Sequence, residues 1–273
     1  MVKILYKLEP SVDAVTALFL RMSMALPFFL IAYWNTPKKK LDSTLYLKVF
    51  LLGFLGYYLS SYLDFWGLEY ISAGLERLIL FVYPTIVIIL SFLFLNKKIS
   101  KLELLSLIIT YTGIFLVFSA ETVPKTKETF IGSFLIFICA ITYAIYLIGS
   151  GELIPIFGSR LFTSIAMATA CSIVCIHFLF LKGVNMLFNL SKEAFLLGFG
   201  MAIITTVIPT FLLSEGIKRV GSSTASIIGT VSPVTTIFLA WFFLNEEMSS
   251  IQWIGTLFVM FGVFLVGKRK KEI

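Results

Sequence analysis

Five charged residues lie within, or at the ends of, long apolar stretches of this sequence: Arg21, Asp64, Glu69, Glu76 and Arg77. A charge in hydrocarbon is costly, so such residues usually face a water-filled cavity or an opposite charge. A pair of Arg21 or Arg77 with Asp64 would neutralise both partners, whereas Glu76 and Arg77 are neighbours and are not expected to face one direction. The pattern indicates either an outer gate or titrating carboxylate of a transport path, or a salt bridge that holds helix ends together.

Two prolines, Pro84 and Pro233, interrupt apolar stretches at corresponding places. Inside a helix, each would remove a hydrogen bond and leave a carbonyl open four residues earlier, at Leu80 and at Gly229. Matched interruptions of this kind predict a substrate site between two halves of a transporter. A simple packing kink is the alternative, because proline is common in membrane helices.

Aromatic residues with polar tips accompany these positions: Tyr57, Tyr58, Tyr62, Trp66 and Tyr83. They would give a cavity walls that suit amphipathic or aromatic solutes, although tyrosine and tryptophan also gather at membrane interfaces. The residues that we expect to line a substrate cavity or gate are Arg21, Tyr57, Asp64, Arg77, Tyr83, Pro84, Ser232 and Pro233.

Motifs for catalysis or metal binding are not evident. His177 is the single histidine, and the sequence has neither an HExxH motif nor a GxxxxGK[ST] phosphate loop. Cys171 and Cys175 share a helix face, but no histidine or carboxylate joins them there. We therefore expect no enzyme, no metal site and no cofactor, and an intramembrane enzyme is the weakest of the alternatives.

The composition points to lipid as the solvent. Of 273 residues, 59% are hydrophobic and 14% are charged, whereas globular chains carry about 25% charged residues. The net charge of +7 would suit nucleic acid, but the basic residues lie in short loops between apolar stretches, which is the arrangement of membrane proteins. The expected partners are the lipid bilayer and a small-molecule substrate, without nucleic acid; the oligomeric state is open.

Nine stretches are long and apolar enough to cross a bilayer as helices. Because only helices satisfy their own backbone groups in lipid, the sequence predicts an all-α, polytopic bundle of nine transmembrane helices. They span 14–34, 45–66, 77–95, 102–119, 130–149, 161–181, 194–215, 222–244 and 250–267.

Basic residues in the loops predict the orientation. Placing the C-terminal segment 268–271 in the cytoplasm puts 14 lysines and arginines inside and 7 outside or at the outer rim. Such a bias predicts a cytoplasmic C-terminus. It also places Glu215, Lys218 and Arg219 at the inner end of the second half, as a cluster that we interpret as topological.

An internal repeat organises the chain. Residues 67–117 and 216–266 align without a gap at a shift of 149, with 14 identical positions among 51. Asn96 is followed by two lysines and Asn245 by two glutamates, so the backbone pattern is kept while the charge reverses, as inverted repeats require. The predicted units are residues 1–120, with four helices, and residues 130–273, with five; a partner for the helix at 130–149 would precede Met1.

The sequence resembles the EamA-type permeases of the drug/metabolite transporter superfamily. The resemblance rests on short motifs in both halves. Residues 9–11 lead into the apolar stretch with Arg21, and residues 142–146 form the corresponding kind of motif at the start of the second half. The remaining motifs occur as pairs: residues 83–84 with 232–233, and residues 95–96 and 113–116 with 244–246 and 262–265. The resemblance implies a ten-helix fold of two inverted halves, of which this sequence lacks the first helix.

The resemblance also implies a function. Such proteins are secondary transporters that export small organic metabolites, often amino acids, by alternating access through a central cavity. We therefore expect a multi-pass protein of the cell (inner or plasma) membrane. The alternative is a non-transporting or lipid-handling membrane protein. In the family the first helix would form part of the cavity wall, so a chain that lacks it could lack a complete substrate cavity.

Overall fold

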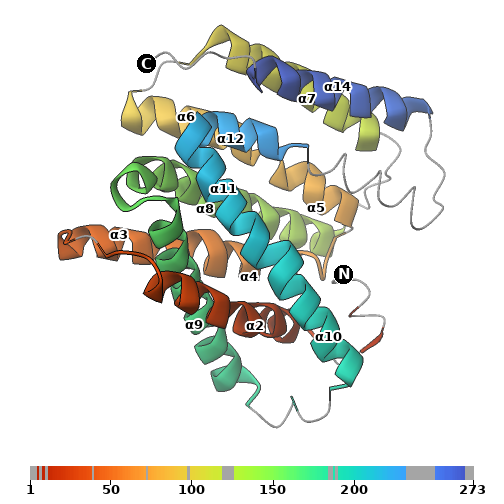
Figure 1. Cartoon of the computed structure of the whole chain (residues 1–273). Helices are drawn as coiled ribbons and strands as arrows, with labels where there is room; N and C mark the ends of the chain where they lie inside the picture. The colour runs from red at the N-terminus through yellow and green to blue at the C-terminus, as the bar shows by residue number, and fades with distance from the viewer. Residues whose placement is uncertain are drawn as a thin grey trace.

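A computed structural model describes residues 5, 8–9, 12–38, 40–71, 73–96, 99–118, 126–183, 187, 190–231 and 250–267. Within these residues, every long regular element is helical, which agrees with the all-α prediction. The helices lie side by side in Figure 1, and α8 runs through the middle of the bundle.

The helical elements follow the chain in a simple order. The first half contains α2 (Ala14–Trp34), α3 (Ser43–Gly53), the π-helical segment η1 (Phe54–Leu59), α4 (Ser60–Gly67), α5 (Ala73–Leu80), α6 (Tyr83–Leu95) and α7 (Lys101–Phe118). The second contains α8 (Lys127–Phe157), α9 (Ser159–Leu181), α10 (Lys192–Gly200), the π-helical segment η3 (Met201–Val207), α11 (Ile208–Val220), α12 (Ser222–Gly229) and α14 (Ser250–Gly267).

Side-chain caps explain where several helices begin. Asp13 accepts a hydrogen bond from Thr16 N at 3.0 Å at the start of α2. Ser191 does the same from Ala194 N, at 3.2 Å, at the start of α10. These side chains replace partners that the first N–H groups of a helix lack. At the α11–α12 junction the chain turns at Gly221, whose φ of 80° suits a residue without a Cβ.

Among the described residues, six helical stretches are long and apolar enough to cross a membrane: 14–34, 43–67, 75–95, 127–157, 159–181 and 192–220. Each includes a predicted span, which supports a multi-pass integral membrane protein. Helix α8 continues to Phe157, beyond the predicted end at 149. The described part of 222–244 ends at residue 231, and the total of nine spans stays a prediction.

The prediction that Pro84 lies well inside a helix is wrong in detail. Helix α5 ends at Leu80, two turn residues follow, and α6 begins at Tyr83, so Pro84 is in the first turn of a new helix. Proline is tolerated there, because the first N–H groups of a helix have no intrahelical acceptor. The interruption itself was expected, and it falls at Phe81 and Val82. Pro233 and Ser232 lie outside the described residues.

Burial is distributed as expected for a protein surrounded by lipid. Large apolar side chains are exposed on the outside, with Phe180 86%, Phe94 75% and Trp34 74% exposed. Polar side chains such as Ser60, Ser214 and Thr206 are buried. In water the outer surface would be an extended apolar patch, which soluble monomers rarely carry.

The element boundaries repeat along the chain. A shift of 149 residues carries α5 onto α12 and α7 onto α14, end for end, and carries η1 to within two residues of η3. Two pairs of corresponding helices also pack on each other: α7 on α14 at one side of the bundle and α2 on α9 at the other (Figure 1). This correspondence agrees with a repeat, and the inverted orientation of its halves stays a prediction.

Candidate functional site

A cavity of about 310 Å³ lies between elements from both halves. Helices α2, α4, α5 and α6 with η1 form one side, and α8, α11 and α12 with η3 form the other. Its volume is at the lower end of the range for small-molecule sites. The polar side chains on its wall are Arg21, Tyr57, Ser60, Ser61, Asp64, Arg77, Tyr83, Cys139, Tyr143, Thr205, Thr206, Thr210 and Ser226.

Five of the eight residues expected at a cavity or gate lie on this wall. They are Arg21, Tyr57, Asp64, Arg77 and Tyr83. Pro84 is buried beside Tyr83 without lining the cavity, and the other two lie outside the described residues. Leu80 and Gly229, where we expected open carbonyls, also line it.

The cavity wall repeats with the same shift of 149 residues. Six pairs of lining residues correspond in this way: Gly56 with Thr205, Tyr57 with Thr206, Ser61 with Thr210, Asp64 with Leu213, Arg77 with Ser226 and Leu80 with Gly229. The two halves thus contribute corresponding positions to the cavity wall, but the side chains at these positions differ in chemistry. The charged members of these pairs all belong to the first half.

The charged residues pair differently from the prediction. Arg77 Nε lies 3.1 Å from Oε2 of Glu76, although these neighbours were not expected to face one direction. The long Arg77 side chain, 42% exposed, folds back to a glutamate that is 1% exposed. The structure records this ion pair in place of the predicted pair with Asp64. Arg21 donates from Nη2 to Ser61 Oγ at 3.2 Å and lies 5.0 Å above the Phe65 ring.

Tyrosines join the two sides of the cavity. Tyr83, at the start of α6, donates from its hydroxyl to the Ser226 carbonyl of α12 at 3.0 Å. Tyr57 of η1 meets Tyr146 of α8 edge to face, with ring centroids 4.7 Å apart. Tyr143 meets Tyr83 in the same way at 5.2 Å. The two Tyr83 contacts hold the interrupted helix α5–α6 against the second half, and the Tyr57 contact holds η1 against it.

The other predicted wall aromatics lie elsewhere. The Tyr58 hydroxyl is 3.2 Å from Nδ1 of His177, and the rings of Tyr58 and Tyr62 both meet the imidazole edge to face. The Trp66 ring lies against Tyr62, tilted by 36°. This group, which connects η1 and α4 with α9, is absent from the cavity wall. His177 is therefore a packed residue in the structure.

Sequence reasoning missed the hydroxyl groups of the second half. Thr205 and Thr206 lie in η3, and Thr210 follows one turn later in α11. The Thr206 hydroxyl bonds to the Met201 carbonyl five residues earlier, at 3.3 Å. The backbone of η3 is itself π-helical, and such widened turns are frequent at functional sites. The repeat could have identified Thr206, because it corresponds at the shift of 149 to Tyr57, which was expected to line the cavity.

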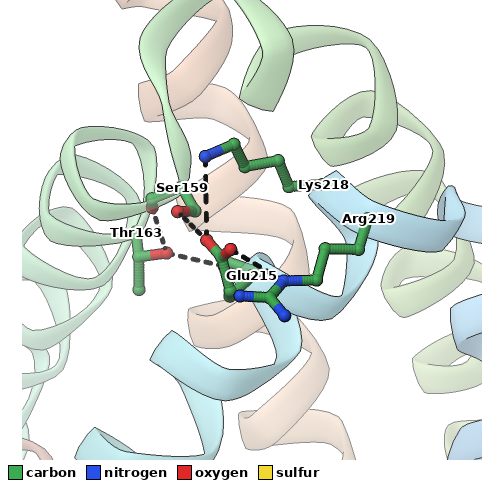
Figure 2. A network of polar contacts seen from close by, with 6 residues as sticks. Ser159, Thr163, Glu215, Lys218 and Arg219 are labelled. Atoms are coloured by element: carbon green, nitrogen blue, oxygen red, sulfur yellow. Dashed lines mark hydrogen bonds and ion pairs between the residues drawn. The ribbon is translucent and has the colours of Figure 1, made fainter.

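A polar network ties α9 to α11 beyond one end of the cavity (Figure 2). Glu215 accepts from Ser159 Oγ at 2.7 Å and from Arg219 Nε at 3.0 Å, with Lys218 Nζ at 4.0 Å. One turn away, Thr163 bonds to Ser214 at 2.6 Å. The cluster predicted at this end is thus assembled as an interhelical clamp.

The described residues provide no obvious place for a metal. Among them, no three His, Cys, Asp or Glu side chains gather closely enough to hold an ion. The three cysteines are free thiols, and Cys139 alone lines the cavity. The arrangement suits recognition of a small polar solute by charge, hydroxyl groups and aromatic faces.

Comparison with known proteins agrees with this description. The model of the EamA-like transporter family matches residues 2–119 and again residues 130–268. The uncharacterized transporter YcbK of Bacillus subtilis is 31% identical over 280 residues, which cover 98% of this chain and 88% of that protein. The uncharacterized transporter YetK of the same organism is 25% identical over 233 residues, covering 80% and 67%.

A likeness in structure extends over nearly the whole chain. A solved crystal structure superposes with a TM-score of 0.75 and covers 93% of this chain and 88% of its own. The two sequences are 14% identical, so the likeness concerns the fold alone.

Proposed function

This chain belongs to the EamA-like transporter family, and we propose that it exports small organic metabolites such as amino acids across the cell membrane. The observation that carries the proposal is the polar cavity between the interrupted helix α5–α6 and helix α12. A membrane protein without a transport path has no need of two arginines and a carboxylate on the wall of a cavity, because a charge within the membrane is costly. We place the C-terminus in the cytoplasm, as the loop charges predict.

The cavity chemistry supports an amino acid as the solute. The guanidinium groups of Arg21 and Arg77 suit a carboxylate, which they can bind through paired hydrogen bonds. The Asp64 carboxylate suits an ammonium group. The rings of Tyr57, Tyr83 and Tyr143 suit an apolar or aromatic side chain. The outward direction rests on the resemblance to EamA-type proteins.

Alternating access is supported by the repetition of the cavity wall. Two halves that share a backbone but face opposite sides can exchange conformations, which opens the same site to each side in turn. The clamp at Glu215 would then hold one end closed in this conformation. An inverted arrangement requires that positions 97 and 246, which correspond at the shift of 149, lie on opposite sides of the membrane.

Transport is tested by reconstitution into liposomes loaded with each of the twenty labelled amino acids. We expect saturable release by the parent protein and at least tenfold slower release by Arg21→Ala and by Asp64→Asn. The matched control is Arg160→Ala, which removes an exposed arginine at the start of α9, away from the cavity. Release no faster than from protein-free liposomes, for every amino acid, would reject the proposal.

A lipid-handling protein is the second candidate. It would be supported by rapid exchange of a fluorescent phospholipid between leaflets of the same liposomes, together with the absence of amino acid release. The membrane orientation is tested separately, with single cysteines at 97 or 246 in a variant that lacks Cys139, Cys171 and Cys175. An impermeant maleimide should label one position from each side, and labelling of both from one side would remove the inverted repeat.

A further inference from the structure

The second half contributes four serine and threonine side chains to the cavity wall, and each of them donates its proton to its own helix. Thr205 and Thr206 both bond to the Met201 carbonyl, at 2.7 and 3.3 Å. Thr210 bonds to the Thr206 carbonyl at 2.8 Å, and Ser226 bonds to a carbonyl of α12 at 2.7 Å. A hydroxyl group that donates in this way keeps its oxygen lone pairs. These four side chains therefore offer acceptors to a solute in the cavity.

The first half contributes the charged groups to the same wall. Arg21 and Arg77 carry N–H donors, and Asp64 is the carboxylate among the described residues that line the cavity. Oδ1 of Asp64 is buried without a hydrogen-bond partner. Helix α2, which carries Arg21, packs against η3, which carries Thr206. Guanidinium donors and hydroxyl acceptors thus belong to neighbouring parts of the wall.

This combination matches the two charged groups of an α-amino acid. Its carboxylate and its ammonium group are attached to one carbon atom, so a site for it needs donors and acceptors close together. The ammonium group has three N–H bonds, and each one left without an acceptor in a buried site is costly. Asp64 can accept one of them through its unpartnered Oδ1. Thr206 and Thr210, which are 3% and 6% exposed and share a helix face four residues apart, can accept the other two.

We propose that Thr206 and Thr210 determine the specificity of the carrier by binding the α-ammonium group of the solute through their hydroxyl oxygens. Asp64 completes this subsite, and Arg21 binds the carboxylate of the same solute. The assignment rests on the proposed function and adds a consequence to it. A carboxylic acid without an amino group leaves the three acceptors unpaired, and a site built to bind an N–H group rejects such an analogue strongly.

Specificity is measured as a ratio of affinities. The purified protein in lipid nanodiscs is equilibrated with each of the twenty labelled amino acids, and the carboxylic acid that lacks the amino group but is otherwise identical competes with it. We expect the parent to prefer the amino acid by about a hundredfold or more. Thr206→Val and Thr210→Val should each lower this ratio about tenfold, the effect of one hydrogen bond to a charged group. Arg21→Ala should weaken the binding of both solutes and leave their ratio unchanged.

Two further variants separate the hydroxyl oxygen from the packing of the side chain. Thr206→Ser keeps a hydroxyl group and should keep the ratio of the parent. Thr112→Val is the matched control, because the exposed Thr112 on α7 bonds to its own helix in the same way, to Ile108 O at 2.9 Å, and is absent from the cavity wall. If a valine variant does not fold, alanine at the same position takes its place.

The outcomes separate this assignment from the proposed function. A ratio that does not fall in either the Thr206 or the Thr210 variant, while the parent binds amino acids, overturns the subsite but leaves the carrier. A parent that binds the amino acid and its deaminated analogue equally well has the same consequence. Absence of binding of all twenty amino acids to the parent rejects the proposed function and this subsite with it.

Discussion

Gly229 is the residue at which a single methyl group should disturb the contact between α12 and the interrupted helix α5–α6. An added Cβ would press against the Tyr83 hydroxyl, which donates to Ser226 O at 3.0 Å. Tyr83 would have to withdraw by about 1 Å to reach an ordinary contact distance. The hydrogen bond would be lost, at about 1 kcal/mol, and overpacking adds about 1 kcal/mol or more. Gly229→Ala should therefore destabilise the protein by about 2 kcal/mol.

Thermal unfolding in detergent, followed by circular dichroism, measures this effect. A loss of about 2 kcal/mol corresponds to a fall in Tm of about 4–8 °C for a protein of this size, and amino acid release should slow because the methyl group enters the cavity. Tyr83→Phe removes the hydroxyl that clashes, so Gly229→Ala should cost much less in that background. Gly216→Ala is the matched control, since an added Cβ there meets nothing within 4 Å. Equal effects of Gly229→Ala with and without the hydroxyl would refute the reasoning.

Two further predictions concern helix contacts. Gly53→Ala places a Cβ against the backbone carbonyl of Ala166, so it should force α3 from α9 and lower Tm, at a cost of about 1–3 kcal/mol; an unchanged Tm would contradict the close contact. At the start of α2, burial raises the pKa of Asp13, but hydrogen bonds from Lys182 and Thr16 outweigh it and hold that pKa below its ordinary value. The folded state therefore gains stability from ionised Asp13 at neutral pH and loses it as the pH falls through the folded pKa. Asp13→Asn should lower the free energy of unfolding at pH 7 by no more than about 1 kcal/mol, because Asp13 and Lys182, the partners of the ion pair, are both 35% exposed. A stability difference between the parent and Asp13→Asn that grows at low pH would contradict this sign.

The positions of the long helices were readable from the sequence, because lipid imposes two simple requirements. A spanning segment must be long and apolar, and its backbone must be helical. The stretches at 14–34 and 161–181 needed nothing more, and α2 and α9 follow them closely. The interruption before Pro84 was also predictable. Its position two residues earlier was not, since the place where a helix restarts depends on packing around Tyr83.

The cavity wall was only partly predictable. Charged residues inside apolar stretches identified Arg21, Asp64 and Arg77, because few other reasons place a charge there. The ion pair of Arg77 with Glu76 was missed, since helix geometry was applied to Cα positions and not to the reach of a long side chain. The threonines of η3 were missed because a hydroxyl in a membrane helix usually bonds to its own backbone and carries no separate signal.

The contrast between a repeated backbone and an unrepeated chemistry has a mechanistic consequence. At the shift of 149, the positions of Asp64, Glu76 and Arg77 are occupied by Leu213, Ala225 and Ser226. A symmetric carrier would have charged residues in both halves, each set reached from its own side. Here the second half has none at the corresponding positions, so under the proposed alternating access the same residues would meet both sides in turn. The two halves would then move around Asp64 and Arg77 in each cycle, and the Tyr83–Ser226 contact, which joins the halves at the cavity wall, should break and re-form as the carrier turns over.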